Sequence, residues 1–284
     1  MKVAIIGSTG QLGTDLVKVF STRHEVAALT HKDIEVENPA SCKVIEEKRP
    51  DAVINTAAFH RTDDCEVYPE RAFQVNAVGA KNVAEACNRI GAVCVYISTD
   101  YVFDGRKGVP YNEEDQPNPI NTYGVSKLAG ELFTRNYCEK HYVVRVASLF
   151  GVAGASGKGG NFVETMIGKA RKGENIRVVD DVVMSPTYTM DAAVVLRSLL
   201  EGEADYGVYH ITNSGYCSWF EFAKTIFELL DIDADLKPIS SNDFALKARR
   251  PKFSALTSTR GVRLRGWREA LESYLKEKGH LQSL

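Results

Sequence analysis

The chain has 284 residues, with 35 basic and 37 acidic side chains that give a formal net charge of −2. This near balance lacks the basic surface of a nucleic-acid-binding protein, and a content of 44% hydrophobic and 25% charged residues excludes a disordered or collagen-like chain. The length is sufficient for two domains of about 150 residues or for one large α/β domain. No apolar run approaches the roughly 20 residues of a membrane-spanning helix. Since no signal-peptide pattern precedes the first apolar run either, we expect a cytoplasmic location and no membrane partner.

The first half of the chain alternates short apolar runs with longer stretches of helical periodicity. Strands are predicted over residues 3–6, 25–29, 52–55, 93–97 and 142–146. Helices are predicted between them, over residues 12–20, 40–48, 69–90 and 122–139. Apolar strands without polar alternation are typical of a parallel sheet that is buried on both faces. The alternation therefore predicts an α/β fold with a doubly wound parallel sheet of the Rossmann type, in which ligands bind at the carboxyl ends of the strands.

The pattern becomes less regular near residue 151, where a glycine-rich stretch over residues 151–161 is long enough for a functional lid. Beyond it we expect a helix from residue 161, strands near 176–179 and 208–211, and helices near 190–200, 218–230 and 267–278. We predict a dinucleotide-binding domain over residues 1–150 and a smaller, mixed substrate-binding lobe over residues 151–284, the two interleaved. The six cysteines form no CxxC pair, so we expect reduced thiols and no zinc site.

A glycine-rich turn follows the first predicted strand and begins the first predicted helix. Its sequence is GSTGQLG, with the spacing GxxGxxG. Glycines permit a tight turn and a close approach of the backbone to a pyrophosphate, and the first N–H groups of a helix attract anions. The position of the motif inside the first β-α unit favours a dinucleotide site over an ordinary strand-helix turn. The predicted cofactor-binding residues of this turn are Gly7, Thr9, Gly10, Gln11, Leu12 and Gly13.

The end of the second predicted strand distinguishes NAD from NADP. An NAD enzyme usually has an Asp or Glu there, which binds the 2′-hydroxyl of the ribose. This chain has Thr30, His31 and Lys32 instead. Because Lys32 and His31 could pair with a 2′-phosphate, we expect NADPH as the cofactor, with NADH as the alternative. Asp33 weakens the pattern, and the competing interpretation is that these are solvated charges on a loop.

Candidate catalytic residues lie at the end of the fourth predicted strand and at the start of the helix that follows it. Tyr123 and Lys127 are four residues apart and so project from one face of a helix, while the strand ends in Ser98-Thr99-Asp100. A free tyrosine has a pKa of about 10, which is too high for an efficient acid at neutral pH. We expect the Lys127 ammonium to lower the pKa of Tyr123 by stabilising the phenolate. A surface Tyr–Lys pair is the alternative interpretation, since a YxxxK pattern alone is common.

These motifs resemble those of the extended short-chain dehydrogenase/reductases and, within them, those of the dTDP-4-dehydrorhamnose reductase group. The matching segments run in order over nearly the whole chain: GSTGQLG, DAVINTAA at 51–58, STDYVFDG at 98–105, PINTYGVSKLAGE at 119–131, NFVETM at 161–166, SPTYTMD at 185–191 and RRPKFSAL at 249–256. The later segments are specific to this group.

The resemblance implies roles for individual residues. Contacts with the pyrophosphate are implied for Gly10, Gln11 and Leu12. The rest of the cofactor cleft is implied at Glu35, Val36, Ala57, Ala58 and Phe59. The implied catalytic triad, of which the last two also contact the cofactor, is Thr99, Tyr123 and Lys127. The residues implied to hold a nucleotide-sugar are Thr99, Asp100, Tyr101 and Arg250.

Some positions depart from the pattern of this group. Ser148 stands shortly after the fifth strand, where the group often has a tryptophan near the sugar, and residues 57–61 read AAFHR rather than an AAAYT-like sequence. Some members bind Mg²⁺ through acidic residues at a dimer interface. Asp15 matches one of these acids, but Met190 stands where a second is expected. We therefore expect no metal, and the identity of the sugar stays open.

The implied activity is an NADPH-dependent reduction of the 4-keto group of a nucleotide-linked deoxysugar, with dTDP-4-dehydro-L-rhamnose converted to dTDP-L-rhamnose. Two alternatives stay open: an epimerase or 4,6-dehydratase of the same superfamily, and a regulatory subunit that resembles that of methionine adenosyltransferase. The dehydratases have an acid pair directly after the catalytic threonine. Here only Asp100 follows Thr99, before Tyr101, which argues against dehydration. The expected partner is the nucleotide-sugar, bound by a monomer or a homodimer.

Overall fold

A six-stranded, wholly parallel sheet forms the centre of the computed structural model, which describes residues 1–155, 160–202, 204–244 and 246–282. Its strand order is β10-β5-β4-β3-β1-β2. The strands are β1 (Lys2–Ile6), β2 (Glu25–Leu29), β3 (Ala52–Asn55), β4 (Val93–Thr99), β5 (His141–Val146) and β10 (Gly207–His210). This order, which runs from β1 to β2 in one direction and from β1 through β3, β4 and β5 to β10 in the other, confirms the predicted doubly wound α/β fold. The predicted glycine-rich stretch over 151–161 is described only in part, because residues 156–159 lie outside the described residues.

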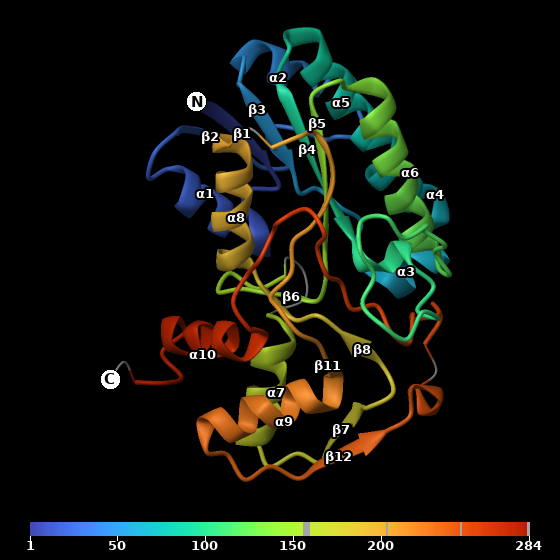
Figure 1. Ribbon diagram of the computed structural model, residues 1–284, viewed down its shortest axis with the longest axis vertical. Helices are drawn as coiled ribbons and strands as arrows, with labels where there is room; N and C mark the ends of the chain where they lie inside the picture. The colour runs from blue at the N-terminus through green and yellow to red at the C-terminus, as the bar shows by residue number, and fades with distance from the viewer. Residues whose placement is uncertain (156–159, 203, 245, 283–284) are drawn as a thin grey trace.

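Helices cover both faces of this sheet (Figure 1). One face is packed by α1 (Gln11–Phe20) and α8 (Thr189–Glu201), which share a buried core with alternate residues of the strands. The other face is packed by α2 (Lys43–Lys48) and α5 (Gly79–Ile90), with α6 (Thr122–Tyr137) beside α5. Because successive strand residues point to opposite faces, Val3 and Ile5 enter the first core while Ala4 and Ile6 enter the second.

The helix predicted over residues 69–90 is divided into three parts. It consists of α4 (Pro69–Phe73), a π-helical turn over Gln74–Val78 and α5. The π turn holds the buried Asn76, whose side chain accepts a hydrogen bond from the Phe59 amide (2.8 Å) and donates to Ser126 Oγ (2.9 Å). The preceding helix α3 (Thr62–Val67) was not predicted, because its six residues are too few to show a helical period. The helix predicted over 40–48 begins later, at Lys43.

A second, smaller unit packs around its own hydrophobic core (Figure 1). Its helices are α7 (Phe162–Arg171), α9 (Trp219–Leu230) and α10 (Trp267–Glu277). Its short strands pair as β7 (Ile176–Val179) with β12 (Leu236–Ile239) and as β8 (Val183–Met184) with β11 (Cys217–Ser218), while β6 (Leu149–Phe150) and β9 (Thr187–Tyr188) pair where the chain passes between the units. Both α8 and β10 return to the large sheet after the chain has entered this unit. The division at residue 150 stays a prediction.

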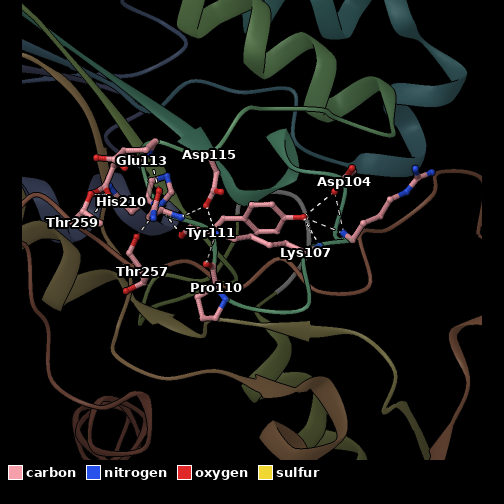
Figure 2. A network of polar contacts seen from close by, with 12 residues as sticks. Asp104, Lys107, Pro110, Tyr111, Glu113, Asp115, His210, Thr257 and Thr259 are labelled. Carbon is pink, nitrogen blue, oxygen red and sulfur yellow. Dashed lines mark hydrogen bonds and ion pairs between the residues drawn. The ribbon is translucent and has the colours of Figure 1, made fainter.

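A loop after β4 is fastened to the last third of the chain by the polar network in Figure 2. The Tyr111 amide donates to the Ala255 carbonyl (2.8 Å), and the Tyr111 carbonyl accepts from the Thr257 amide (2.8 Å). The Glu113 carboxylate accepts from the backbone amides of His210 and Thr259, both at 2.9 Å. Burial lowers the pKa of His210 to about 4, so this ring is neutral and donates from Nδ1 to the Thr257 carbonyl (2.9 Å). The network brings the segment 254–259 to the carboxyl ends of the strands.

No helix among the described residues combines the length and the apolar character that crossing a membrane requires.

A buried ion pair joins α6 to β5. Arg145 donates to both carboxylate oxygens of Glu131, from Nε (2.9 Å) and from Nη2 (2.7 Å), and only 3% and 1% of the two residues are exposed. Ser98 Oγ, near the end of β4, donates to the same carboxylate at 2.5 Å. One carboxylate therefore fixes α6 against two neighbouring strands.

We predict that Glu131→Gln lowers the free energy of unfolding by about 3–5 kcal/mol, because it leaves the Arg145 guanidinium buried without a counter-charge. Urea denaturation measures the loss. Glu46→Gln is the matched control, since it removes an exposed carboxylate 2.6 Å from Arg89 Nη2 and should cost less than about 1 kcal/mol. Equal losses in the two variants would contradict the prediction.

Candidate active site

The glycine-rich turn joins β1 to α1 at the carboxyl edge of the sheet. Gly7 has a φ of 76°, a conformation that favours glycine, and its N–H donates to the Leu29 carbonyl at 3.0 Å. A Cβ at Gly13 would lie 2.1 Å from the Gly7 carbonyl oxygen, so no other residue fits there without movement of the turn. No side chain caps the first N–H groups of α1, which begins after Gly10. The turn therefore offers backbone donors and a helix N-terminus to an anionic group.

The side chains of this turn are used within the protein. Gln11 Nε2 donates to the Leu149 carbonyl (3.0 Å), and Gln11 Oε1 accepts from the Gly151 amide (3.2 Å). Leu12 is buried in the core between α1 and the sheet, whereas Thr9 is exposed. Contacts of Gln11 and Leu12 with a pyrophosphate would therefore come from their backbone.

A cavity of about 280 Å³ lies beside the turn, between the ends of β1, β2 and β3. It brings together seven residues that were predicted to bind the cofactor, namely Gly7, His31, Glu35, Val36, Ala57, Ala58 and Phe59. Its walls also include charged residues that sequence reasoning missed, among them Glu37, Arg61, Asp64 and Arg71. Arg61 stands in the AAFHR sequence, which departs from the AAAYT-like sequence of the group that the chain resembles. This departure was the one feature of the sequence that could have drawn attention to Arg61. The glycine-rich turn and the cavity together fit an extended dinucleotide.

The charged and titratable residues of the turn after β2 differ in their contacts. Asp33 Oδ2 accepts from the amide and the hydroxyl of Thr30, both at 2.8 Å, and these bonds lower the pKa of Asp33. This carboxylate is thus ionised and hydrogen-bonded within its own turn. His31 Nδ1 lies 3.2 Å from Glu35 Oε1, while Lys32 is exposed and does not line the cavity.

Thr99 and Tyr123 meet where β4 ends and α6 begins. The side chain of Asn121 accepts from the Gly124 amide (2.8 Å) and so caps α6 just before Tyr123. Thr99 Oγ1 donates to Asp100 Oδ1 (3.0 Å), and the Thr99 hydroxyl lies near the Tyr123 side chain. Burial raises the pKa of Tyr123, the Asp100 carboxylate raises it further, and the nearby Thr99 hydroxyl lowers it. The phenol is therefore fully protonated at neutral pH.

Lys127 is only 2% exposed, one turn along α6 from Tyr123. Its Nζ donates to the Ile97 carbonyl (2.6 Å) and lies 4.1 Å from the centre of the Tyr96 ring. Burial lowers the pKa of Lys127 to about 7, although the Glu131 carboxylate acts in the opposite direction. The expectation that Lys127 lowers the pKa of Tyr123 is not met in this geometry, because burial of the phenol dominates and the lysine points to the Ile97 carbonyl.

The remaining predicted residues form a chain of contacts beside Tyr123. Asp100 is 3% exposed and accepts from Ser254 Oγ (2.5 Å), and burial raises its pKa to about 6. A buried Asp100 would act on a substrate through Thr99. The Tyr101 ring lies 6.0 Å from that of Tyr123, edge to face, and the neighbouring Arg250 charge opposes the rise that burial causes in the pKa of Tyr101.

Partners of these residues were missed in the sequence. Arg250 is held by Asp63 of α3, and Thr122 is held by Glu66 of the same helix. Ser254, the partner of Asp100, lies in the segment RRPKFSAL but was not singled out. No spacing rule could have revealed these contacts, because each joins residues that are distant in sequence.

Asp15 and Met190 bear on the metal question. Asp15 is buried and accepts a hydrogen bond from Thr189 Oγ1, and burial raises its pKa. Met190 packs against both hydrophobic cores. Across the part of the chain that the structure describes, no three His, Cys, Asp or Glu side chains are grouped to hold a metal ion. The expectation that no metal is needed stays a prediction.

The strand-end position of Ser148 is also unusual. Ser148 has a φ of 42°, in the left-handed region that non-glycine residues rarely adopt. Its carbonyl accepts from the Thr187 amide at 3.2 Å, which holds the turn after β5 against β9.

Comparison with known proteins identifies relatives over nearly the full length. The family model described as the RmlD substrate binding domain matches residues 1–279. The chain is 38% identical to the spore coat polysaccharide biosynthesis protein SpsK of Bacillus subtilis, over 98% of each chain. It is 37% identical to a dTDP-4-dehydrorhamnose reductase of Streptomyces griseus, over 94% of this chain and 90% of that one. A crystal structure of dTDP-4-dehydrorhamnose reductase from Bacillus anthracis, in complex with NADP, superposes with a TM-score of 0.92 at 38% identity, covering 97% and 99% of the two chains.

We predict that the buried Lys127 makes the stability of the protein depend on pH. With a pKa near 7 in the folded protein and an ordinary lysine pKa in the unfolded chain, the unfolded state binds more protons between these values. The free energy of unfolding should therefore rise with pH above 7, relative to Lys127→Met, by up to about 1.4 kcal/mol per pH unit. Urea denaturation of both proteins between pH 7 and 9 measures the difference. A difference that does not change with pH would show that the folded protein holds Lys127 as an ammonium.

Proposed function

The chain belongs to the RmlD substrate binding domain family, and from this membership we propose that it is an NADPH-dependent oxidoreductase that reduces the 4-keto group of a nucleotide-linked deoxysugar. The proposed reaction converts dTDP-4-dehydro-L-rhamnose to dTDP-L-rhamnose. The activity of the Streptomyces griseus relative, a dTDP-4-dehydrorhamnose reductase, supports this substrate, and the NADP complex of the Bacillus anthracis enzyme supports the cofactor. A cytoplasmic location and a monomeric or homodimeric state stay predictions.

The observation that supports the proposal is the position of Thr99 near Tyr123 at the carboxyl end of β4, with Lys127 one turn along α6 and the glycine turn and its cavity at the same edge of the sheet. The backbone of the turn, Glu35, Val36 and residues 57–59 would hold the cofactor. When bound, NADPH supplies a hydride to the keto carbon. The protein must then provide a proton for the oxygen and stabilise the negative charge that develops on it.

Tyr123 is the proposed proton donor. Its raised pKa keeps the phenol protonated, so the proton is available when the oxygen becomes an alkoxide. Thr99 holds the oxygen by a hydrogen bond. Lys127 anchors the ribose next to the nicotinamide and, with a pKa of about 7, can take up a proton and stabilise the tyrosinate that is left. Tyr101 and Arg250 hold the nucleotide-sugar.

The dehydratase alternative receives no support from the site. A dehydratase needs a second acid after the catalytic threonine, whereas Tyr101 follows Asp100 here. The Asp100 carboxylate is itself held by Ser254 and Thr99. A buried carboxylate with these partners is suited to positioning the threonine.

We predict that Tyr123→Phe lowers kcat about 10²–10⁴-fold, because general acid catalysis is worth roughly this factor. The phenol proton is needed only as the alkoxide forms, so the Kd for NADPH should stay within about threefold of the parent value. The rate is followed as NADPH oxidation with enzymatically made dTDP-4-dehydro-rhamnose, and the Kd by fluorescence titration.

Tyr137→Phe is the matched control, since Tyr137 ends the same helix and is 38% exposed. It should leave both constants unchanged. A Tyr123→Phe rate within a few-fold of the parent rate would place the proton donor elsewhere. A parent that binds NADPH but oxidises it with no keto-sugar nucleotide would favour the regulatory-subunit alternative.

We predict that NADPH binds more tightly than NADH and that Lys32→Ala removes part of the difference. An exposed pair between Lys32 and a 2′-phosphate is worth about 1 kcal/mol, so the Kd for NADPH should rise about fivefold while that for NADH is unchanged. Lys43→Ala, at the exposed start of α2, is the control. Tighter binding of NADH by the parent in fluorescence titrations would overturn the prediction.

A further inference from the structure

Asp63 and Arg250 form a two-point ion pair across the candidate substrate site. Arg250 Nη1 donates to Asp63 Oδ1 and Nη2 donates to Oδ2, both at 2.8 Å. Asp63 Oδ1 also accepts from the Ala248 amide (2.9 Å), and Arg250 Nη1 donates to the Ala248 carbonyl (2.6 Å). The bonds with Arg250 hold the pKa of Asp63 at about 2, so the carboxylate is ionised at any working pH.

Helix α3, which carries Asp63, is also fixed to the start of the helix that carries Tyr123. Glu66 accepts from the Thr122 amide (2.7 Å) and from the Thr122 hydroxyl (2.9 Å). Asn121, the cap of α6, donates to the Arg249 carbonyl at 2.8 Å. The backbone of 248–250 is thus held against α3 and the beginning of α6.

Arg250 lies next to the reacting groups of the proposed mechanism. Its charge acts on the neighbouring Tyr101 phenol, and the Tyr101 ring packs edge to face on Tyr123. A guanidinium has five N–H donors, and the bonds with Asp63 and Ala248 use three of them, so two are left. It is partly exposed, with 19% of its side chain accessible.

We propose that Asp63 is a positioning residue, which holds the Arg250 guanidinium in the orientation that binds the phosphates of the nucleotide-sugar. The proposal rests on the proposed function. A carboxylate that binds both terminal nitrogens fixes the plane of the guanidinium, and a fixed plane can present its other donors to a phosphate without losing further side-chain freedom. Without Asp63, the long and flexible Arg250 side chain would be ordered only when the ligand binds, and this ordering would cost affinity.

The negative charge of Asp63 weakens phosphate binding, whereas its effect on the orientation of Arg250 strengthens it. These opposite effects make the proposal testable. A carboxylate beside the phosphate site repels the anionic ligand. If charge alone mattered, Asp63→Asn would tighten binding. If the fixed orientation of Arg250 matters more, the same substitution weakens binding, because a neutral amide cannot accept two charge-assisted bonds.

The experiment measures the Kd for dTDP by calorimetry, together with KM and kcat for the nucleotide-sugar. For Asp63→Asn we expect the Kd and KM to rise roughly 10- to 100-fold, which is the scale for the loss of a hydrogen bond to a charged group. The kcat should stay within about threefold, and the Kd for NADPH should not change. Asp63→Glu, which keeps the carboxylate, should recover part of the affinity. Unchanged or tighter binding of dTDP by Asp63→Asn would overturn the proposal.

A matched control separates positioning from general destabilisation. Asp191→Asn removes a carboxylate that binds Arg265 in the same two-point geometry, at 2.8 Å from Nε and from Nη2, away from the cleft. It should lower stability without raising the Kd for dTDP. In a double-mutant cycle, Asp63→Asn should not weaken dTDP binding further in an Arg250→Ala background, because the favourable effect of the carboxylate acts through the arginine and only its repulsion remains. Additive effects would overturn the proposal.

The outcomes for the two proposals are distinct. A parent protein that binds dTDP but oxidises NADPH with no keto-sugar nucleotide contradicts the proposed function, and the dTDP affinities of the variants still decide the role of Asp63. A parent protein that does not bind dTDP overturns the role of Asp63 as well.

Discussion

The buried carboxylate of Glu131 determines where α6 lies, and the candidate site depends on that helix. It binds Arg145 of β5 and Ser98 of β4, so the helix cannot slide along the sheet without leaving charges unpaired in the interior. Thr99 follows Ser98 directly, and Lys127 lies one helical turn before Glu131. The same carboxylate opposes the effect of burial on the pKa of Lys127. The Glu131 carboxylate that fixes α6 against the sheet therefore also affects the protonation of Lys127.

A second constraint is the return of the segment 248–257 to the strand ends. Ser254 binds Asp100, the backbone on either side of Leu256 pairs with Tyr111, and Arg250 binds Asp63. Each contact joins this segment to the first half of the chain. Without the segment, the carboxyl ends of the strands would lack these contacts. The proposed substrate side of the site thus needs this late segment in contact with the first half of the chain, whereas the glycine turn lies within the first half.

The sequence predicted the features that are determined locally. Apolar periodicity located the five strands of the first half, because burial on both faces excludes polar residues from them. The glycines of the first turn were identified from their spacing, and the structure shows that Gly13 has no room for a side chain. The contacts of Asp63, Glu66 and Ser254 could not be predicted, since a carboxylate or hydroxyl finds its partner through tertiary packing.

The same limit explains two incorrect details. A single helix over 69–90 fits the apolar pattern, but the π turn is set by what Asn76 bonds, namely Phe59 and Ser126, and these partners lie on other elements. Four-residue spacing placed Tyr123 and Lys127 on one helix face. It could not show that the long lysine side chain turns to the Ile97 carbonyl.

Burial acts in opposite directions on the two titratable groups that the proposed chemistry needs. It raises the pKa of the Tyr123 phenol and lowers that of the Lys127 ammonium, because each charged form loses its hydration. The resting site therefore favours a phenol that retains its proton and a lysine that is close to half neutral at pH 7. In the proposed reaction, the tyrosinate that remains after Tyr123 gives its proton to the alkoxide favours a protonated Lys127, which lies one helical turn away. The resting site carries little charge on Tyr123 and Lys127. Proton transfer from the phenol becomes favourable only when negative charge has developed on the substrate oxygen.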